Sequence, residues 1–210
     1  MRIVGLNINR TKEVIVMEVN ADKEYRSFRN YEIRAEEETG ELIVEGYAAK
    51  FEEETVLFEH DGIEYKEIVK RGAFDGADMK NVIFRYNHEG KVMARTRNKT
   101  LQLSIDDVGL YARIQLSGTK EGKEHYEEIR GGYIDEMSFA FKIEDDYYNK
   151  ETRTRELRKF KKIFDVASVD IPAYSGTSIS ARSYFEAQQE ELKRQESERR
   201  RKKLALMARL

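Results

Sequence analysis

The stretch from Gly131 to Phe141 reads GGYIDEMSFAF, and it is the part of the sequence around which the fold is organised. Two glycines end a helix-like segment, and a short apolar strand follows. Because side chains alternate along a strand, Met137 and Phe139 share one face. Ser138 and Ala140 share the other, where the small alanine leaves room above the hydroxyl for an extended peptide. The pattern alone indicates a half-buried strand, and most serines in such strands do no chemistry.

Length and composition limit the architecture. A chain of 210 residues predicts one domain with appendages, or at most two small domains. Apolar residues make up 40% of it, with 12 Tyr and 10 Phe, which is enough to close one core. Charged residues reach 37%, well above the usual quarter, so some segments are expected to be entirely surface. The net charge of −2 gives no general attraction to nucleic acid or membranes.

Residue types that are missing or rare exclude several kinds of site. There is no cysteine, so disulfides, thiol catalysis and thiolate metal sites are excluded. A multi-histidine metal site would need nearly all of the three histidines, so we expect no metal or other cofactor. The first 20 residues lack the continuous apolar run of a signal peptide, and no segment has the apolar length to span a bilayer. We therefore expect a soluble intracellular protein.

The order of elements favours a mainly β fold with helices (α+β). Alternation of apolar and polar residues predicts short strands at 42–48, 55–58, 63–65, 82–86, 101–105, 110–116, 137–143 and 163–169. Thr119 is expected to cap a helix over 120–130 that ends at the two glycines. The charged segment 144–158 is expected to be a connection. We predict a mostly antiparallel β-barrel or sandwich with helices packed outside.

The C-terminal part of the sequence favours a long helix. From about Tyr184 onward there is no glycine or proline, and between Lys193 and Lys203 there is no apolar residue. Such a helix has no face to bury, so a charged single helix, solvated or bound to a partner, is expected. The predicted division is an N-terminal extension at 1–24, a domain at 25–183 and the charged helix at 184–210.

His88 is the best candidate for a base that would activate Ser138. It ends an apolar strand, and strand ends next to loops are where sites tend to be built. The alternative is a turn residue bonded to its own loop. His60 lies in a predicted hairpin turn, and His125 is expected to be a partly exposed helix residue.

Asp165 stands inside the apolar stretch IFDVA, where a strand should be buried. An unpaired carboxylate there would cost several kcal/mol, so it needs a partner. An imidazole N–H would serve, and a catalytic acid has this role. The alternative is an ion pair with one of the 38 lysines and arginines, which abundance favours. Asp170 is a weaker candidate, because it lies at the strand's end where water can reach it.

A series of short motifs lies between Tyr25 and Tyr174. They are Arg26-Ser27-Phe28, Glu45-Gly46-Tyr47-Ala48, Arg71-Gly72-Ala73-Phe74, Tyr86-Asn87-His88, Asp107-Val108-Gly109-Leu110-Tyr111, Met137-Ser138-Phe139, Val166-Ala167-Ser168-Val169 and Ile171-Pro172-Ala173. In order and spacing they resemble the prohead (capsid maturation) serine proteases of tailed bacteriophages.

The resemblance implies Ser138 as nucleophile, His88 as base and Asp165 as third member, a position that is commonly glutamate in the family. Ala140 stands where a glycine is often found. These proteases look related in fold to the herpesvirus assembly protease, a β-barrel ringed by helices that uses a second histidine as its third residue. The protease domain would be 25–183.

The implied activity is proteolysis inside the immature capsid, in the cytoplasm of the bacterial host. The substrate would be the scaffolding protein or the scaffolding segment of the major capsid protein, and then the enzyme itself. The charged helix could hold the protease to the scaffold or be removed by self-cleavage. A homo-oligomer stays open, and no membrane or nucleic-acid partner is expected.

Three other functions compete with this one. A non-catalytic capsid scaffold or structural protein could keep the same fold. A nucleic-acid-binding β-barrel could use the basic run at 199–203, although the near-neutral net charge argues against it. A metal hydrolase is a distant third. The sequence contains no G-x-S-x-G elbow, H-E-x-x-H helix, phosphate-binding loop or dinucleotide fingerprint.

Overall fold

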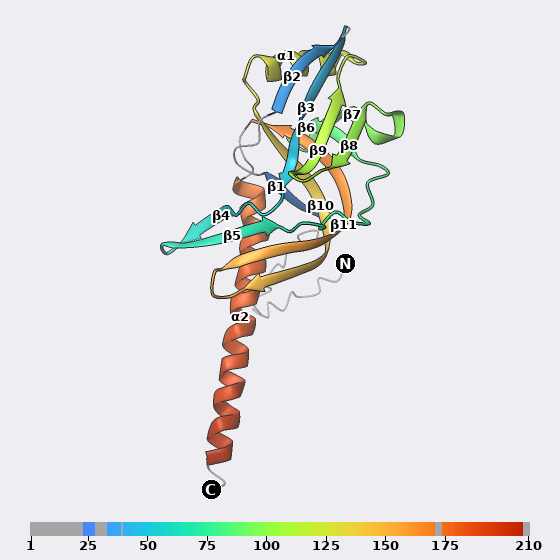
Figure 1. The fold of residues 1–210 in the computed structure, drawn as a ribbon. Helices are drawn as coiled ribbons and strands as arrows, with labels where there is room; N and C mark the ends of the chain where they lie inside the picture. The colour runs from blue at the N-terminus through green and yellow to red at the C-terminus, as the bar shows by residue number, and fades with distance from the viewer. Residues whose placement is uncertain (1–22, 28–32, 39, 171–173, 208–210) are drawn as a thin grey trace, which may run out of the picture.

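The computed structural model describes residues 23–27, 33–38, 40–170 and 174–207. These residues form two β-sheets, two α-helices and a short 3-10 helix (Figure 1). The strand or hairpin expected in the N-terminal extension falls outside them, except that β1 begins at Glu24. The only proline, Pro172, also lies outside the described residues.

The larger sheet contains seven strands in the order β1-β10-β11-β5-β4, with β6 pairing with β11 and β7 pairing with β6. Their bounds are β1 Glu24–Ser27, β4 Thr55–His60, β5 Ile63–Val69, β6 Ile83–Tyr86, β7 Glu89–Arg95, β10 Glu136–Asn149 and β11 Thr154–Val169. The predicted serine strand is β10, and the predicted strand of Asp165 is β11, its direct neighbour.

The smaller sheet contains four strands in the order β2-β3-β9-β8. Their bounds are β2 Ile33–Glu38, β3 Glu41–Lys50, β8 Leu101–Ile105 and β9 Gly109–Gln115, and the 3-10 helix η1 Thr96–Asn98 precedes β8. The backbones of β3 and β9 come very close at Gly109, where a Cβ would lie 2.0 Å from the Ala49 carbonyl oxygen. Only glycine fits this position without a backbone shift.

The predicted mainly β fold with helices (α+β) is confirmed, but the barrel ringed by helices is not. Within the described part of the chain both sheets are open. The cause is β11, which pairs in parallel with β5 along 154–157 and with β6 along 165–168. β5 therefore pairs with the first part of β11 and β6 with the last part, and register shifts between β10 and β11 from Ala140 to Asp146 lie between these two parts. Because the two parts of β11 have different partners, the sheet branches at β11 and does not close.

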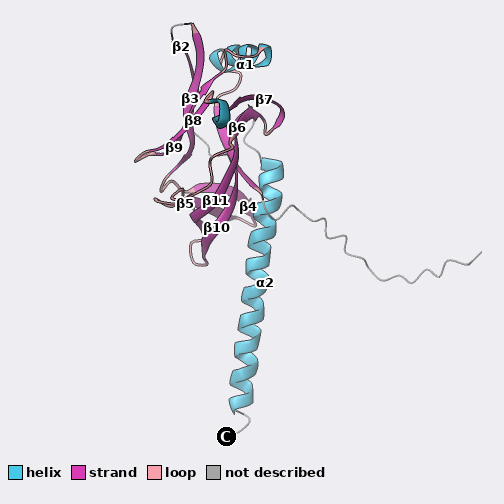
Figure 2. Cartoon of the chain, turned by 90° about the vertical axis from the view of Figure 1, so that its right-hand side faces the viewer, coloured by secondary structure: helices cyan, strands magenta, loops and turns pink. Residues whose placement is uncertain are grey.

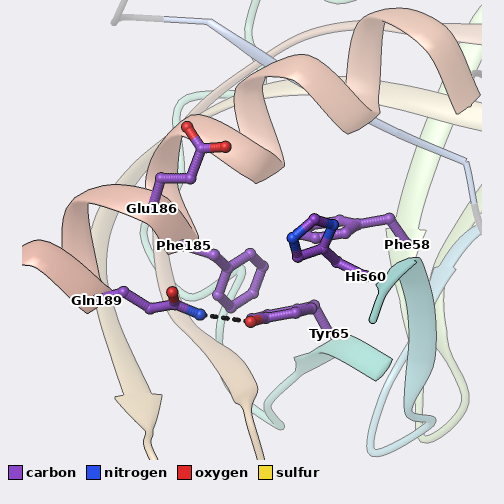
Figure 3. Close-up of a pocket in the computed structure, with 6 residues that line it drawn as sticks. All are labelled: Phe58, His60, Tyr65, Phe185, Glu186 and Gln189. Carbon is purple, nitrogen blue, oxygen red and sulfur yellow. Dashed lines mark hydrogen bonds between the residues drawn. The ribbon is translucent and has the colours of Figure 1, made fainter. Parts of the chain in front are cut away.

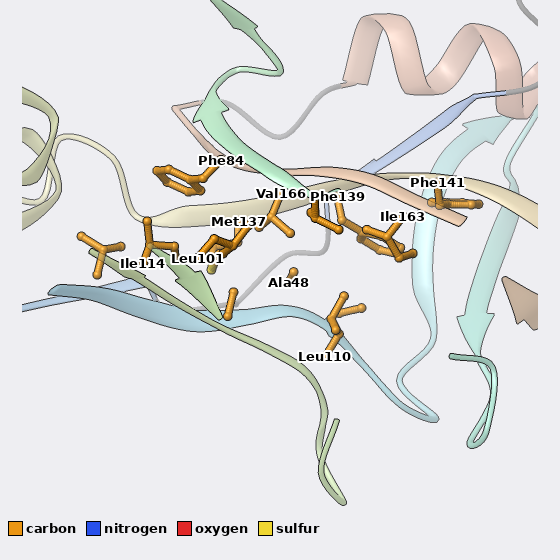
Figure 4. Close-up of a cluster of buried hydrophobic side chains, with 14 of the residues drawn as sticks. Ala48, Phe84, Leu101, Leu110, Ile114, Met137, Phe139, Phe141, Ile163 and Val166 are labelled. Atoms are coloured by element: carbon orange, nitrogen blue, oxygen red, sulfur yellow. The ribbon is translucent and has the colours of Figure 1, made fainter. Parts of the chain in front are cut away.

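The main core lies between the two sheets (Figure 4). The predicted apolar face of β10 is confirmed, since Met137, Phe139 and Phe141 are fully buried. They face side chains of the smaller sheet such as Ala48 and Leu110. The opposite face of β10 is buried as well, with Ser138 and Ala140 at 0% exposure, so the expectation of a half-buried strand was wrong.

Helix α1 spans Lys120–Arg130 as predicted and packs against β2, β3 and β7. Its start is fixed by Thr119, whose side-chain oxygen accepts a hydrogen bond from Gly122 N at 2.9 Å. Its end is followed by Gly132, which has a φ of 72° that other residues rarely adopt.

The charged segment 144–158 is not a connection. It forms the outer arms of β10 and β11, which pair from Asp145 with Lys159 to Asn149 with Thr154. Some of its charges are buried, and Arg155 is only 2% exposed because it is paired with carboxylates inside the protein. The high charge density of 144–158 predicts an exposed segment, but in the structure some of these charges form buried ion pairs.

Helix α2 (Tyr174–Met207) begins earlier than expected and runs away from the sheets (Figures 1 and 2). Phe185 holds it to the β4–β5 hairpin, where it packs against Leu57 and Tyr65 and is 1% exposed. The run 193–203 is exposed throughout, as the sequence predicts. Among the described residues, neither α-helix combines the length and the hydrophobicity that a transmembrane span requires. The domain boundary at 183 stays a prediction.

Candidate active site

The three candidate residues, far apart in the sequence, meet in one hydrogen-bonded row. Ser138 lies on β10, Asp165 on β11, and His88 in the turn between β6 and β7. His88 Nε2 lies 2.6 Å from Ser138 Oγ, and His88 Nδ1 is hydrogen-bonded to Asp165 Oδ1. The side chains of His88 and Asp165 are only 8% and 3% exposed. This is the order of groups that activates a serine for nucleophilic attack.

The position of His88 depends on an unusual turn. Asn87 and His88 join β6 to β7, and both have positive φ, 45° and 60°. Two left-handed residues are what a type I′ hairpin turn requires, and histidine pays roughly 1–3 kcal/mol of strain there. The turn is held by Asn87 Nδ2, which donates to Asp170 Oδ1 at 3.1 Å, and by Arg85, which donates to the His88 carbonyl at 3.3 Å.

Asp170 therefore helps to hold the turn, whereas the carboxylate in the row belongs to Asp165. The Asp170 carboxylate accepts hydrogen bonds from Asn87 and from the Tyr86 hydroxyl, at 2.6 Å for the latter. Asp165, in contrast, is fixed beside Ser138 by the sheet, because it pairs with Ala140 on the neighbouring strand. The register thus brings Asp165 and not Asp170 to the imidazole.

Both partners expected for Asp165 are present. His88 contacts one carboxylate oxygen, and Lys23 Nζ lies 2.9 Å from the other. Burial acts to raise the pKa of Asp165, but the hydrogen bonds and charges of His88 and Lys23 outweigh it and hold the pKa below its ordinary value. The carboxylate is therefore ionised at neutral pH and accepts a proton-bearing Nδ1, which leaves Nε2 free to act as a base toward Ser138.

Comparison with known proteins identifies the family of the chain. A family model described as caudovirus prohead serine protease matches residues 29–193. The chain belongs to the prohead serine protease family. This confirms the family that the short motifs resemble. No curated protein and no solved structure matches the chain, so the likeness to the herpesvirus assembly protease stays a prediction.

In this member of the prohead serine protease family, β1 covers the candidate nucleophile. Ser27 pairs with Ser138 across the β1–β10 ladder, and Ser138 Oγ lies 2.9 Å from the Arg26 carbonyl oxygen. The Tyr25 ring meets the His88 ring edge-on, with centroids 4.7 Å apart. The Ser138 hydroxyl has one proton, so it can donate either to His88 or to Arg26, but not to both at once.

A buried group of charges lies beside β1. Arg26 and Glu67 are both 0% exposed and form a two-pronged ion pair, with Nη2 to Oε1 at 3.0 Å. Glu24 joins Arg26 to Arg155, at 2.6 Å to each, and Asp146 binds the other side of Arg155. From the sequence, Arg26 is recognised only as part of a motif, and no local pattern marks Glu24, Glu67, Asp146 and Arg155 as members of a buried group.

His125 is buried, so the expectation of partial exposure was wrong. It is 4% exposed, and its two ring nitrogens lie 2.8 Å from Glu128 Oε2 and 2.5 Å from Ser168 Oγ. Burial lowers the pKa of His125, although the hydrogen bond and charge of Glu128 oppose this. His125 and Ser168 thus form a second serine–histidine pair. Its serine lies on β11, where it pairs with Met137, and Ser138 is not part of it.

The described residues contain a pocket, and it lies away from the row. No group of three or more histidine, aspartate or glutamate side chains there is arranged to hold a metal ion. The pocket has a volume of about 150 Å³ and lies between the β4–β5 hairpin and α2 (Figure 3). It is lined by Phe58, His60, Tyr65, Phe185, Glu186 and Gln189. None of the three row residues lines it, so it is separate from the candidate active site.

Proposed function

We propose that the protein is a serine endopeptidase of prohead maturation, with Ser138 as nucleophile, His88 as general base and Asp165 as the residue that orients the imidazole. The observation that carries the proposal is the continuous hydrogen-bonded row from Asp165 through His88 to Ser138. Membership in the prohead serine protease family supports the same reaction.

In the proposed reaction, Ser138 Oγ attacks the carbonyl carbon of the scissile bond while His88 Nε2 accepts the hydroxyl proton. Asp165 stays ionised, as its lowered pKa favours, and stabilises the imidazolium. His88 then gives the proton to the leaving amine, and the C–N bond breaks. Water, activated by the same nitrogen, hydrolyses the acyl-enzyme and restores Ser138.

Membership in the family supports the proposed substrates and location. The enzyme would act inside the immature capsid in the bacterial host cytoplasm, on the scaffolding protein or the scaffolding segment of the major capsid protein, and then on itself. The exposed run 193–203 of α2 offers a contact for the scaffold, because nothing in the described part of the chain covers it.

The test is Ser138→Ala in the full chain, co-expressed with the phage capsid proteins. Processing and self-cleavage should vanish while the protein still folds. A serine-directed fluorophosphonate should label the unmutated protein, and mass spectrometry should locate the adduct on Ser138. Ser168→Ala is the matched control, because its hydroxyl also contacts a histidine but lies outside the row. Processing that persists in Ser138→Ala would overturn the proposal.

The competing function is a non-catalytic capsid scaffold on the same fold. One observation favours it: Ser138 is fully buried beneath β1. A scaffold predicts normal capsid assembly with Ser138→Ala and no labelling by the fluorophosphonate. The same experiment therefore separates the two functions.

A further inference from the structure

β1 lies against the candidate active site in the manner of a bound peptide. It is extended, and it adds one antiparallel strand to the edge of β10, which is a common way for proteins to bind peptides. The Arg26 carbonyl is the one that Ser138 Oγ reaches, at 2.9 Å. The preceding side chain, Tyr25, packs on the imidazole of His88.

The Arg26 side chain is held like a recognised substrate group. Its Nε and Nη2 both donate to the carboxylate of Glu67, and the guanidinium carbon lies 5.5 Å from the centre of the Phe141 ring. Arginine and glutamate are both completely buried. A planar guanidinium matches a carboxylate through two parallel hydrogen bonds, whereas lysine offers a single point charge.

Loss of β1 would remove the main partner of Glu67. With β1 in place the buried group contains three carboxylates and two guanidiniums, and the departure of Arg26 together with Glu24 leaves its net charge unchanged. Glu67 would lose both hydrogen bonds from Arg26 and keep, among the described residues, the contact with Arg155 Nη1 at 3.2 Å. A buried carboxylate that loses its partner is destabilised, so Glu67 favours the return of a guanidinium.

We propose that β1 is a substrate bound in cis, that Arg26–Ser27 is a self-cleavage bond, and that Glu67 selects substrates with arginine at the residue whose carbonyl is attacked. This inference rests on the proposed function, and it adds the substrate class and the position of a cut. Once residues 1–26 dissociate, the edge of β10 is free for other chains.

The step follows the proposed mechanism. Ser138 Oγ bonds to the Arg26 carbonyl carbon, and its proton passes to His88 Nε2. The bond from that carbon to Ser27 N breaks, and the proton on His88 moves to this nitrogen, which becomes a new amino terminus. Water then splits the ester between Arg26 and Ser138, which gives the Arg26 carboxylate and restores the serine hydroxyl.

The first measurement uses the purified full chain, with its mass and N-terminal sequence as readouts. The unmutated chain should begin at Ser27, and Ser138→Ala should remain intact. Arg26→Gln and Glu67→Gln should each slow the cut at least tenfold, whereas Arg130→Gln, an exposed arginine on α1, should not change it. Circular dichroism of each variant checks that it is folded.

The second measurement compares substrate peptides. A peptide with the sequence of residues 23–29, KEYRSFR, is compared with one in which citrulline replaces the residue corresponding to Arg26. Citrulline keeps the shape of arginine but has no charge. The arginine peptide should be cut at least tenfold faster by kcat/KM, with a lysine peptide between the two. Folded Glu67→Gln should lose this preference.

Each outcome decides between the inference and the proposed function. If capsid proteins are cut in a Ser138-dependent manner but residues 1–26 are retained and the two peptides are treated alike, the inference fails and the proposed function stands. The same holds if the fluorophosphonate labels Ser138 but neither peptide is cut. If processing does not depend on Ser138, both fail.

Discussion

His88 Nδ1 and Asp165 Oδ1 are hydrogen-bonded although the two residues are 77 positions apart. This contact decides which carboxylate serves the imidazole, because Asp170 binds Asn87 and Tyr86 instead. Asp165 also binds Lys23, so it is both the predicted imidazole partner and half of an ion pair. The contact leads directly to the first prediction.

Asp165→Asn should lower kcat by about 10⁴-fold, because an amide can hold the imidazole in the tautomer that points a proton at Ser138. Asp170→Asn should cost at most about tenfold, since it weakens the hydrogen bonds from Asn87 and Tyr86 that hold the turn. Steady-state kinetics on the processed substrate would compare them. Similar losses for both variants would contradict the assignment of Asp165.

The buried His125 should make stability depend on pH near neutrality. Its folded pKa lies below the ordinary 6.5, so the unfolded state binds more protons below that pH. Stability should be full above about pH 6.5 and fall toward the folded pKa, by up to about 1.4 kcal/mol per pH unit. The groups around the ring are Glu128 on its own helix, Ser168 on β11, and Phe84 and Tyr86 on β6.

Urea unfolding of Ser138→Ala from about pH 7.5 to about pH 5 would measure this slope. Adding His125→Gln should flatten it, whereas adding His60→Gln, at an exposed histidine, should not. An unchanged slope with His125→Gln would mean that another group causes the dependence.

A second pH dependence should appear in acid. Burial acts to raise the pKa of Glu24, but Arg155 and Arg26 overcome it and lower the pKa to about 2 from 4.5. The ionised carboxylate stabilises the fold above about pH 4.5, and this contribution, roughly 3 kcal/mol, is lost as the pH falls toward about 2.

Ser138→Ala, which keeps β1 attached, should therefore lose stability across that window. Adding Glu24→Gln should lower stability at neutral pH and remove much of the acid dependence, while Glu59→Gln, at an exposed site, should change neither. Equal acid curves for the two double variants would contradict the role of Glu24.

Gly109→Ala should destabilise the protein by about 1–3 kcal/mol, because its Cβ would meet the Ala49 carbonyl oxygen at 2.0 Å and Lys50 Cα at 2.8 Å. Both are backbone atoms, so β3 and β9 would have to separate. Gly118→Ala is the matched control, with open space at its Cβ and an expected change within about 0.5 kcal/mol. Thermal unfolding of both variants tests the difference, and equal stability would show that the strands adjust freely.

The sequence predicted local features well where one pattern decided the structure. The apolar face of Met137 and Phe139 and the caps of helix 120–130 depend only on neighbouring residues, and both are confirmed. Ser138, His88 and Asp165 were also predicted from the sequence, and the structure brings them together. Their catalytic roles stay predictions. The burial of Asp165 was predictable because its neighbours are all apolar.

What the sequence did not predict depends on partners that are distant along the chain. The arms 144–158 carry charges that indicate a surface loop, but Arg155 is neutralised by Glu24 and Glu67 from other strands. His125 is buried because Ser168 from β11 supplies a hydrogen-bond partner. The placement of β1 over Ser138 is likewise a matter of long-range pairing, and no local pattern specifies it.

The last prediction concerns the exposed run of α2. If this run tethers the protease to the scaffold, a chain ending at Leu192 should fold normally but enter proheads much less. Ending there keeps Phe185 and Gln189, which hold the helix to Tyr65; a chain ending at Ser183 would lose them. Losing Phe185 would itself cost about 3–5 kcal/mol, so Phe185→Ala in the full chain is the control for instability. Quantitative mass spectrometry of purified proheads would measure incorporation. Unchanged incorporation of the shorter chain would contradict a tether and favour a segment that self-cleavage removes.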